Sequence, residues 1–193
     1  MLEDELIMQI LQEYIESKIE LSSENMTKVL KAFDQKTFKN NRLIVRGGQF
    51  VTKIFFIAKG GVRIVMDLPE KEVTTWIIFE NNFFSNLHAI KTGSASKYKI
   101  AAVGDTEVYS IDANVFYKFY QEIPEWEKFG RLTIEDAFLD IIDSLISFKT
   151  MDAEERYLKL LSKTDIINRI PLKHLASYLG VTPNSLSRIR KNL

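Results

Sequence analysis

The chain has 193 residues and carries 26 basic and 26 acidic side chains, so that its formal net charge is zero. Its hydrophobic content of 46 % excludes a disordered chain, and the absence of cysteine excludes disulfides, thiolate nucleophiles and cysteine-ligated iron–sulfur clusters. No apolar run reaches the roughly 18 residues of a membrane span, and the acidic first five residues are unlike a signal peptide, which together predict a cytoplasmic protein without a membrane partner.

The first half of the chain predicts helices followed by a β-structure. Apolar residues recur every three to four positions over residues 2–33, which is typical of helices. From residue 37 to residue 111 the pattern changes to short alternating or β-branched runs separated by glycine, proline and asparagine. The expected strands are 42–45, 53–58, 61–66, 72–79, 97–103 and 106–111. Strands at this spacing predict an antiparallel barrel or roll.

The helical period returns at Pro124, and the segment from about Glu125 to Lys149 has two apolar stripes. The first stripe is Leu139, Ile142 and Ile146, and the second is Ile134, Phe138, Ile141, Leu145 and Phe148. A surface helix needs only one stripe to face its own core. Either the second stripe is buried within the same chain or it pairs with a second copy. We favour pairing, because a roll and a short C-terminal unit leave little material to cover it.

Residues 172–193 predict two short helices that meet at Gly180. Thr182 is a good N-cap for the second helix, and Pro183 suits its first position. The apolar positions that would pack together are Leu175, Ala176, Leu179, Val181, Leu186 and Ile189. This is the layout of a DNA-binding helix-turn-helix. The polar positions that could bond base edges and phosphates are Thr182, Asn184, Ser185, Ser187, Arg188 and Lys191, with Lys173 on the preceding helix.

The alternative to DNA binding is a helical hairpin that only closes the surface of a domain. The charge distribution favours DNA. Residues 154–193 carry eight basic and three acidic side chains, a net charge of +5, which leaves −5 for the rest of this neutral chain. Positive charge concentrated on the segment that carries the helix pair is most simply explained by phosphate binding.

Three segments together resemble the Crp-Fnr family of transcription regulators: IFFIAKGGVR at 54–63, GDTEV at 104–108 and GVTPNSLSRI at 180–189. The resemblance covers nearly the full chain and implies an α+β fold. It implies N-terminal helices and a cyclic-nucleotide-binding-like jelly roll over 1–123, a central dimerisation helix over 124–150 and a helix-turn-helix domain without a wing over 151–193.

The same resemblance implies a homodimer that binds a palindromic operator in double-stranded DNA. RNA polymerase and an unknown small-molecule effector are further candidate partners. In the family an arginine of the recognition helix reads guanine, and Arg188 occupies the matching place. Without a wing to contact the DNA backbone, we expect a shallower salt dependence of DNA binding than in winged relatives.

The residues with which the family holds a cyclic nucleotide are missing. The family uses Gly-Glu and, about ten residues later, Arg-Ser or Arg-Thr, whereas the corresponding positions here are Phe84-Ser85 and Ser96-Lys97. Without the carboxylate and the arginine, the ribose and the cyclic phosphate lose their partners, so we do not expect cyclic AMP as the ligand. Aromatic residues gather at this place and either fill the core, which we favour, or line a pocket for an apolar ligand. The candidate pocket residues are Phe83, Phe84, Ser85, Ser96 and Lys97.

An enzyme is not expected, because the chain offers few catalytic groups. Its two histidines, His88 and His174, lie in different units without further metal ligands nearby, and no glycine-rich phosphate loop precedes a helix. We expect no metal and no cofactor, and we expect His174 to be exposed or to contact phosphate.

Two functional hypotheses follow. The first is a dimeric DNA-binding regulator that senses an effector other than cyclic AMP or acts constitutively. The second is a ligand- or protein-binding regulatory module whose terminal helix pair is structural and does not bind DNA.

Overall fold

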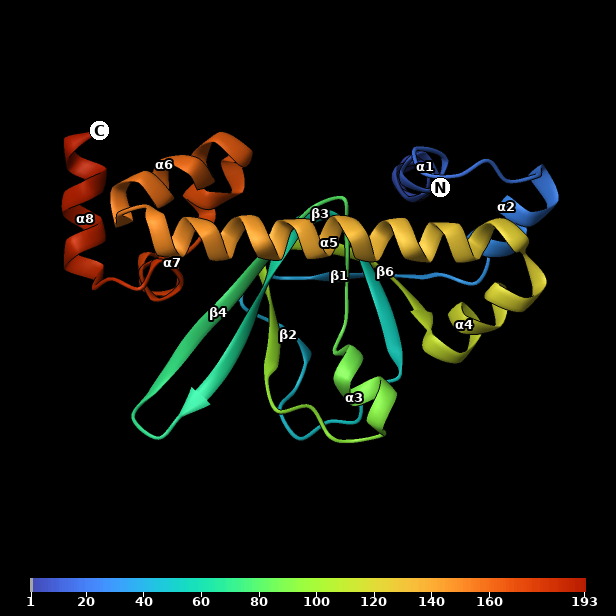
Figure 1. Ribbon diagram of the computed structural model, residues 1–193, viewed down its shortest axis with the longest axis horizontal. Helices are drawn as coiled ribbons and strands as arrows, with labels where there is room; N and C mark the ends of the chain where they lie inside the picture. The colour runs from blue at the N-terminus through green and yellow to red at the C-terminus, as the bar shows by residue number, and fades with distance from the viewer. Residues whose placement is uncertain (1) are drawn as a thin grey trace.

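The computed structural model of the protein describes the backbone of residues 2–193 and the side chains of residues 8–164 and 167–193. Figure 1 shows a β-roll crossed by one long helix, with the N-terminal helices near one end of this helix and the C-terminal helices at the other. The helices are α1 (Leu2–Glu16), α2 (Ser23–Leu30), α3 (Leu87–Thr92), α4 (Ala113–Glu122), α5 (Pro124–Thr150), α6 (Ala153–Lys163), the 3₁₀ helix η1 (Asp165–Arg169), α7 (Leu172–Leu179) and α8 (Pro183–Asn192). No helix in this described part of the chain is both long and apolar enough to cross a membrane.

Two long antiparallel strands form the centre of the roll. The strands are β1 (Asp34–Phe38), β2 (Leu43–Val45), β3 (Lys53–Leu68), β4 (Lys71–Phe79), β5 (Asn82–Phe84) and β6 (Lys99–Asp112). β3 and β6 pair from Lys53 opposite Asp112 to Val65 opposite Lys99. β4 and β5 pair with β3, while β1 and β2 pair with β6. The α+β fold with an antiparallel sheet, predicted from the sequence, is confirmed.

The glycines that suggested turns lie inside these long strands. The sequence pattern divides 53–66 and 97–111 into two strands each, but the structure joins each pair into one. Gly60 has a φ of +87° at a place where the register between β3 and β6 shifts. Gly104 has a φ of +69°. Both glycines therefore bend a continuous strand, as β-bulges do, and the prediction of turns was wrong.

Three apolar clusters hold the molecule together. The first joins α1, α2, α4 and the start of α5, where the rings of Trp126 and Phe129 stack at 4.4 Å. The second fills the interior of the roll. The third packs α6, α7 and α8 together with Ile77 and Val103 of the roll. The C-terminal helices therefore share a core with the roll.

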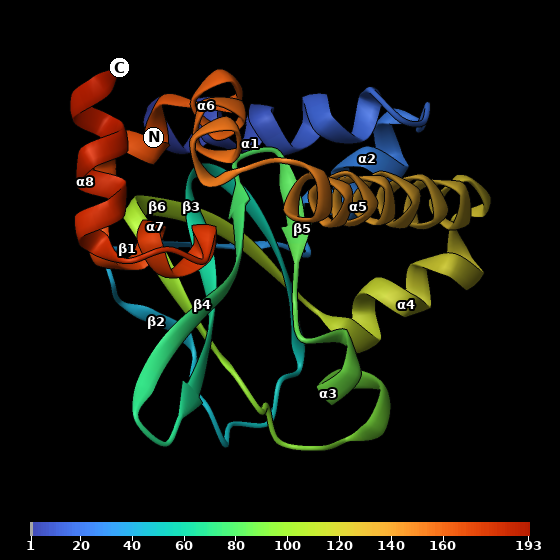
Figure 2. The same ribbon diagram turned by 60° about the vertical axis from the view of Figure 1, so that its left-hand side comes forward.

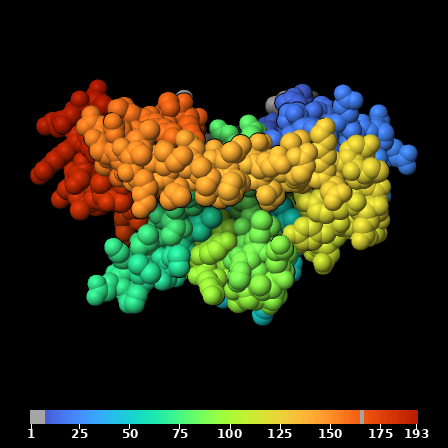
Figure 3. All heavy atoms as spheres, in the orientation of Figure 1, coloured from blue at the N-terminus to red at the C-terminus, as the bar shows by residue number. Residues whose placement is uncertain are grey.

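α5 presents a broad apolar face to solvent in the single chain. Figure 3 shows this helix on the surface along most of its length. From its middle to its C-terminal end this helix exposes Ile134, Phe138, Leu139, Ile142, Leu145 and Ile146, with exposed fractions between 37 % and 63 %. At 3.6 residues per turn these six positions span about 140° of the helix. The two predicted stripes thus merge into one face, whose edge borders the roll. Phe148 packs against Tyr178 with ring centres 5.7 Å apart, and Ile134 and Ile141 line the space between α5 and the roll.

The bend at Gly60 provides a test of the roll. A Cβ atom there would lie 2.8 Å from the carbonyl oxygen of Asp105 and 2.8 Å from Oγ1 of Thr106, whereas one at Gly93, which also has a positive φ, would meet nothing within 4 Å. Gly93→Ala should lose about 1 kcal/mol of unfolding free energy through backbone strain, and Gly60→Ala about 1–3 kcal/mol more through overpacking. Urea unfolding of both variants measures the difference. If both variants lost the same unfolding free energy, the backbone around Gly60 would have moved to accommodate the added methyl group.

Candidate nucleic-acid interface

α7 and α8 form the helix pair that the sequence pattern predicts. Gly180 ends α7 with a left-handed φ of +74°, and the N–H of Val181 donates to the carbonyl oxygen of Ala176 at 3.0 Å. Oγ1 of Thr182 accepts a hydrogen bond from the N–H of Ser185 at 3.1 Å and so caps α8. Pro183 follows at the first helical position. Leu186 is fully buried and faces α7, which orients the rest of α8.

The polar face of α8 is open to solvent. The predicted contact residues Thr182, Asn184, Ser185, Ser187, Arg188, Lys191 and, on α7, Lys173 are all exposed. Arg190 is different, because its guanidinium group lies 5.4 Å from the centre of the Tyr157 ring and is half-buried. The cations that α8 presents outward are therefore Arg188 and Lys191. The hydroxyl of Ser185 also hydrogen bonds with that of Thr182 at 2.9 Å, so it contributes to the cap as well as to the outer face.

The helix pair is docked on the edge of the roll through α7. Figure 2 shows α7 beside β4, with α8 farther out. β4 pairs only with β3, and the N–H of Thr74 on its free edge donates to Oγ of Ser177 at 3.0 Å. The rings of Trp76 and Tyr178 meet edge to face at 6.3 Å. Because these contacts come from α7, they set the position of α8 without covering its polar face.

A charged cluster lies next to this docking contact. Arg63 is buried, with Nη1 donating to Oε1 of Glu72 at 2.8 Å and Nη2 donating to Oδ1 of Asn41 at 2.7 Å. Burial alone would raise the pKa of Glu72, but the hydrogen bond and the charge of Arg63 outweigh it and hold this pKa below its usual value. Nδ1 of His174 on α7 lies 4.0 Å from Oε1 of Glu72.

The expectation that His174 is exposed or contacts phosphate is wrong. Its side chain is only 16 % exposed and faces the roll. Burial, and then the charge of Arg63, lower the pKa of His174 against the opposing effect of Glu72. The spacing of apolar residues on α7 could not reveal this, because the partner groups come from β3 and β4.

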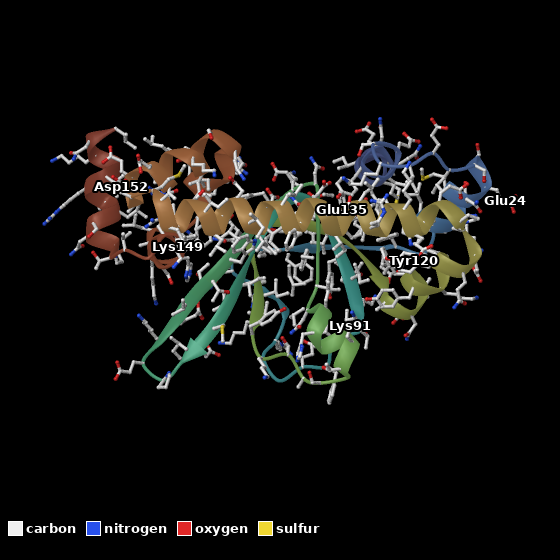
Figure 4. All side chains as sticks on the ribbon, in the orientation of Figure 1. Glu24, Lys91, Tyr120, Glu135, Lys149 and Asp152 are labelled. Atoms are coloured by element: carbon white, nitrogen blue, oxygen red, sulfur yellow. The ribbon has the colours of Figure 1, made fainter. Side chains whose placement is uncertain are left out.

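A second set of polar contacts fixes α6 to α5 and to the end of α7. Nζ of Lys159 on α6 donates to Oδ1 of Asp143 at 2.7 Å and to Oγ of Ser147 at 2.6 Å. Arg156 donates to the carbonyl oxygens of Met151 and Leu179. Figure 4 labels Lys149 near the end of α5 and Asp152, whose side chain caps α6. The turn between α5 and α6 is therefore held by both helices and by α7.

The roll contains a buried polar pair beside α3. Nδ2 of Asn86 donates to Oγ of Ser96 at 2.8 Å, and Oγ of Ser96 donates to the carbonyl oxygen of Tyr98 at 2.6 Å. Oδ1 of Asn86 accepts from the N–H of Ala89 and caps α3. Asn86 and Ser96 are only 2 % and 3 % exposed. Their polar atoms are thus used within the chain.

Comparison with known proteins agrees with this architecture. Residues 35–123 match the family model described as the cyclic nucleotide-binding domain. No curated protein sequence matches the chain. FixK2 from Bradyrhizobium japonicum is 15 % identical, with 83 % of this chain and 84 % of that chain covered and a TM-score of 0.68. The c-di-GMP responsive regulator CLP from Xanthomonas campestris is 13 % identical, with coverages of 89 % and 91 % and a TM-score of 0.67. A mutant of CooA from Carboxydothermus hydrogenoformans is 17 % identical, with coverages of 86 % and 78 % and a TM-score of 0.63.

The chain has the Crp/Fnr fold. The sequence pattern placed the missing carboxylate at Phe84-Ser85 and the missing arginine at Ser96-Lys97. The structure puts Asn86 opposite Ser96, while Oγ of Ser85 donates to the carbonyl oxygen of Lys53.

The five predicted pocket residues do not form one site in this Crp/Fnr fold. Phe83, Phe84 and Ser85 line a groove between the roll and α5, but Ser96 is buried with Asn86 and Lys97 is exposed to solvent. The expectation of core packing is confirmed for Phe84, which is buried and stacks on Phe55 at 5.0 Å. Phe83 serves both purposes, because it packs on Phe56 and also lines the groove.

The position of His174 predicts a pH dependence of folding. The pKa of His174 is lower in the folded protein than in the unfolded chain, so the unfolded chain takes up the proton at a higher pH. The contribution of neutral His174 to the unfolding free energy is therefore complete above about pH 6.5. It is lost as the pH falls through the folded-state pKa. His174→Gln should flatten the dependence of unfolding free energy on pH between about 5 and 7. His88→Gln, on the exposed surface of α3, is the control and should keep the pH dependence of the unaltered protein. Denaturant unfolding at a series of pH values measures this, and an unchanged slope in His174→Gln would contradict the assignment.

Proposed function

We propose that the protein is a dimeric, sequence-specific DNA-binding transcription regulator of the Crp-Fnr type. The observation that carries the proposal is the orientation of α8, whose apolar side is buried against α7 while its polar side, with Arg188 and Lys191, is exposed. A recognition helix needs this arrangement, because base edges and phosphates must be reached from a rigid support. We assign 151–193 to DNA binding, 124–150 to dimerisation and 1–123 to sensing.

Dimerisation is proposed on the exposed face of α5. Apolar residues covering more than a third of a helix surface are unfavourable in water, and a second copy of the same helix would cover them symmetrically. A twofold axis along this face would present two copies of α8 to one duplex. Half-sites one DNA turn apart, roughly 34 Å, would then form a palindromic operator.

The proposed effector is a compound other than cyclic AMP, or the regulator acts without one. This is supported by the Asn86–Ser96 hydrogen bond, which lies in the two segments where the sequence lacks the family's nucleotide-binding residues and offers neither a carboxylate nor a guanidinium group. A cyclic phosphate brought there would have to displace a buried hydrogen bond without gaining an ionic partner.

A specific observation also favours the second hypothesis, a regulatory module with a structural helix pair. The core of the helix pair includes Ile77 and Val103 of the roll, so the pair contributes to the stability of the roll whether or not it binds DNA. The two functions differ in whether α8 recognises a sequence, and selection of duplexes by the protein separates them.

Selection from a pool of random duplexes should enrich a palindrome. Arg188→Ala should lose about 1–3 kcal/mol of discrimination at one base pair of each half-site. Lys191→Ala should weaken binding to all sequences alike and reduce the slope of log K against log salt by about 0.9 for each phosphate that the lysine no longer neutralises. Arg46→Ala removes the same charge from an exposed part of the roll and should change neither. No enriched palindrome, or an unchanged preference in Arg188→Ala, would favour the structural role.

Leu139→Glu tests the dimer. Leu139 is 63 % exposed on the apolar face of α5, so a charge there would be buried by a partner helix. The variant should therefore sediment as a monomer with weakened binding to the palindrome. Leu158→Glu is the matched control, because Leu158 is an exposed leucine on α6. Analytical ultracentrifugation measures both variants. A Leu139→Glu variant that remains dimeric would place the interface elsewhere.

A further inference from the structure

A histidine lies inside the docking contact between α7 and β4. The side chain of His174 is mostly buried there, with Nδ1 at 4.0 Å from Oε1 of Glu72 on β4. Ser177 lies three residues farther along α7, on the same side of the helix, and its Oγ accepts the hydrogen bond from the N–H of Thr74 at 3.0 Å. His174 therefore belongs to the same interface as the hydrogen bond that holds α7 on the edge of the sheet.

The carboxylate nearest to His174 already has a cation as its partner. Oε1 of Glu72 accepts a hydrogen bond from Nη1 of Arg63 at 2.8 Å, whereas 4.0 Å is too long for a hydrogen bond to the imidazole. The guanidinium group of Arg63 is buried, and its Nη2 donates to Oδ1 of Asn41 at 2.7 Å, so it is fixed from two sides. A proton on His174 would thus add a positive charge beside a neutralised acid and a fixed buried cation.

The remaining charges near His174 do not compensate for Arg63. Of the described charged residues that act on His174, namely Arg63, Glu72 and Lys173, only Glu72 is acidic. Lys99 on β6 is a further cation that acts on Glu72. Burial and the charge of Arg63 outweigh Glu72, and together they hold the pKa of His174 below its ordinary value. The docked arrangement therefore favours the neutral imidazole.

We propose that protonation of His174 weakens the docking contact between α7 and β4, which makes this contact sensitive to pH. When α7 separates from β4, His174 reaches water, which solvates its positive charge, and the imidazole moves away from Arg63. Protonation thus shifts the population toward the undocked helix pair. Its effect on α8 and DNA rests on the proposed function, whereas the pH-sensitive docking does not.

The composition of the chain allows a pH effect to be assigned to this residue. Histidine is the side chain whose ordinary pKa gives a change of charge between about pH 5 and pH 8. The chain has two histidines and no cysteine, and the second histidine, His88, is exposed on α3. Substitution of each histidine in turn therefore separates the two possible sources of a change in docking.

Hydrogen exchange at the amide of Thr74 measures the docking contact, because this N–H lies on the free edge of β4 and donates to Ser177 of α7. Its protection factor, corrected for the intrinsic exchange rate at each pH, reports the undocked population. We expect weaker protection than at the amides that pair β3 with β6. We also expect protection of Thr74 to fall at least about threefold between about pH 7.5 and about pH 5.5.

Two matched variants assign the change. His174→Gln keeps a polar side chain that does not titrate, so protection of Thr74 should no longer depend on pH, whereas His88→Gln should keep the dependence of the unaltered chain. The proposal is overturned if the fall is absent from the unaltered chain or persists in His174→Gln. It is also overturned if Thr74 is protected as strongly as the amides between β3 and β6, because α7 would then separate only when the whole chain unfolds.

An NMR titration of His174 in the unaltered chain provides a test that needs no folded variant. Protection of Thr74 should begin to fall below about pH 6.5, the ordinary pKa of an exposed histidine, and should level off below the titration midpoint of His174 in the docked protein. A fall that is complete above the range in which His174 titrates would overturn the proposal.

The effect on DNA binding has a separate readout. The affinity for the selected duplex should be at least about threefold lower at about pH 5.5 than at about pH 7.5, and equal at both in His174→Gln, since lysine and arginine keep their charge over this range. An affinity that does not fall in the unaltered chain would remove the role of docking in DNA binding while leaving the pH-sensitive contact intact. Failure to bind any duplex would instead contradict the proposed function without affecting the result at Thr74.

Discussion

The packing of α7 against the free edge of β4 is the contact on which the arrangement of the molecule depends. It joins the hydrogen bond from the N–H of Thr74 to Ser177 with the edge-to-face contact of Trp76 and Tyr178. Because α7 also holds α8 through Leu186, the outward face of α8 is positioned by the roll. In a Crp/Fnr fold this arrangement provides a direct mechanical connection between the sheet and the helix that we propose reads DNA, without a long flexible linker between them.

α5 connects the other parts of the structure by using its sides differently. Its start is buried through Trp126 and Phe129, its end is held by contacts with α6 and α7, and its middle stands away from the roll. The middle therefore has one exposed apolar face and one side that borders a groove.

The roll satisfies its own buried polar groups beside α3. Asn86 and Ser96 bond to each other there. The pair satisfies its own buried polar atoms, and the stacked rings of Phe55 and Phe84 fill the neighbouring interior. This part of the roll is thus closely packed, and open space lies instead between the roll and α5.

Much of the fold could be predicted from local pattern, since helical periodicity, the cap at Thr182 and the left-handed Gly180 depend on neighbours in sequence. The helix pair, the long helix, the antiparallel sheet and the exposed polar residues of α8 followed from these signals. Other features depended on residues far apart in the chain. Gly60 looked like a turn because a bulge and a turn share the same local requirement, and only the pairing of β3 with β6 distinguishes them. The burial of His174, the partner of Ser96 and the groove between the roll and α5 were decided by tertiary structure, because each depends on which distant surfaces meet and how closely they pack.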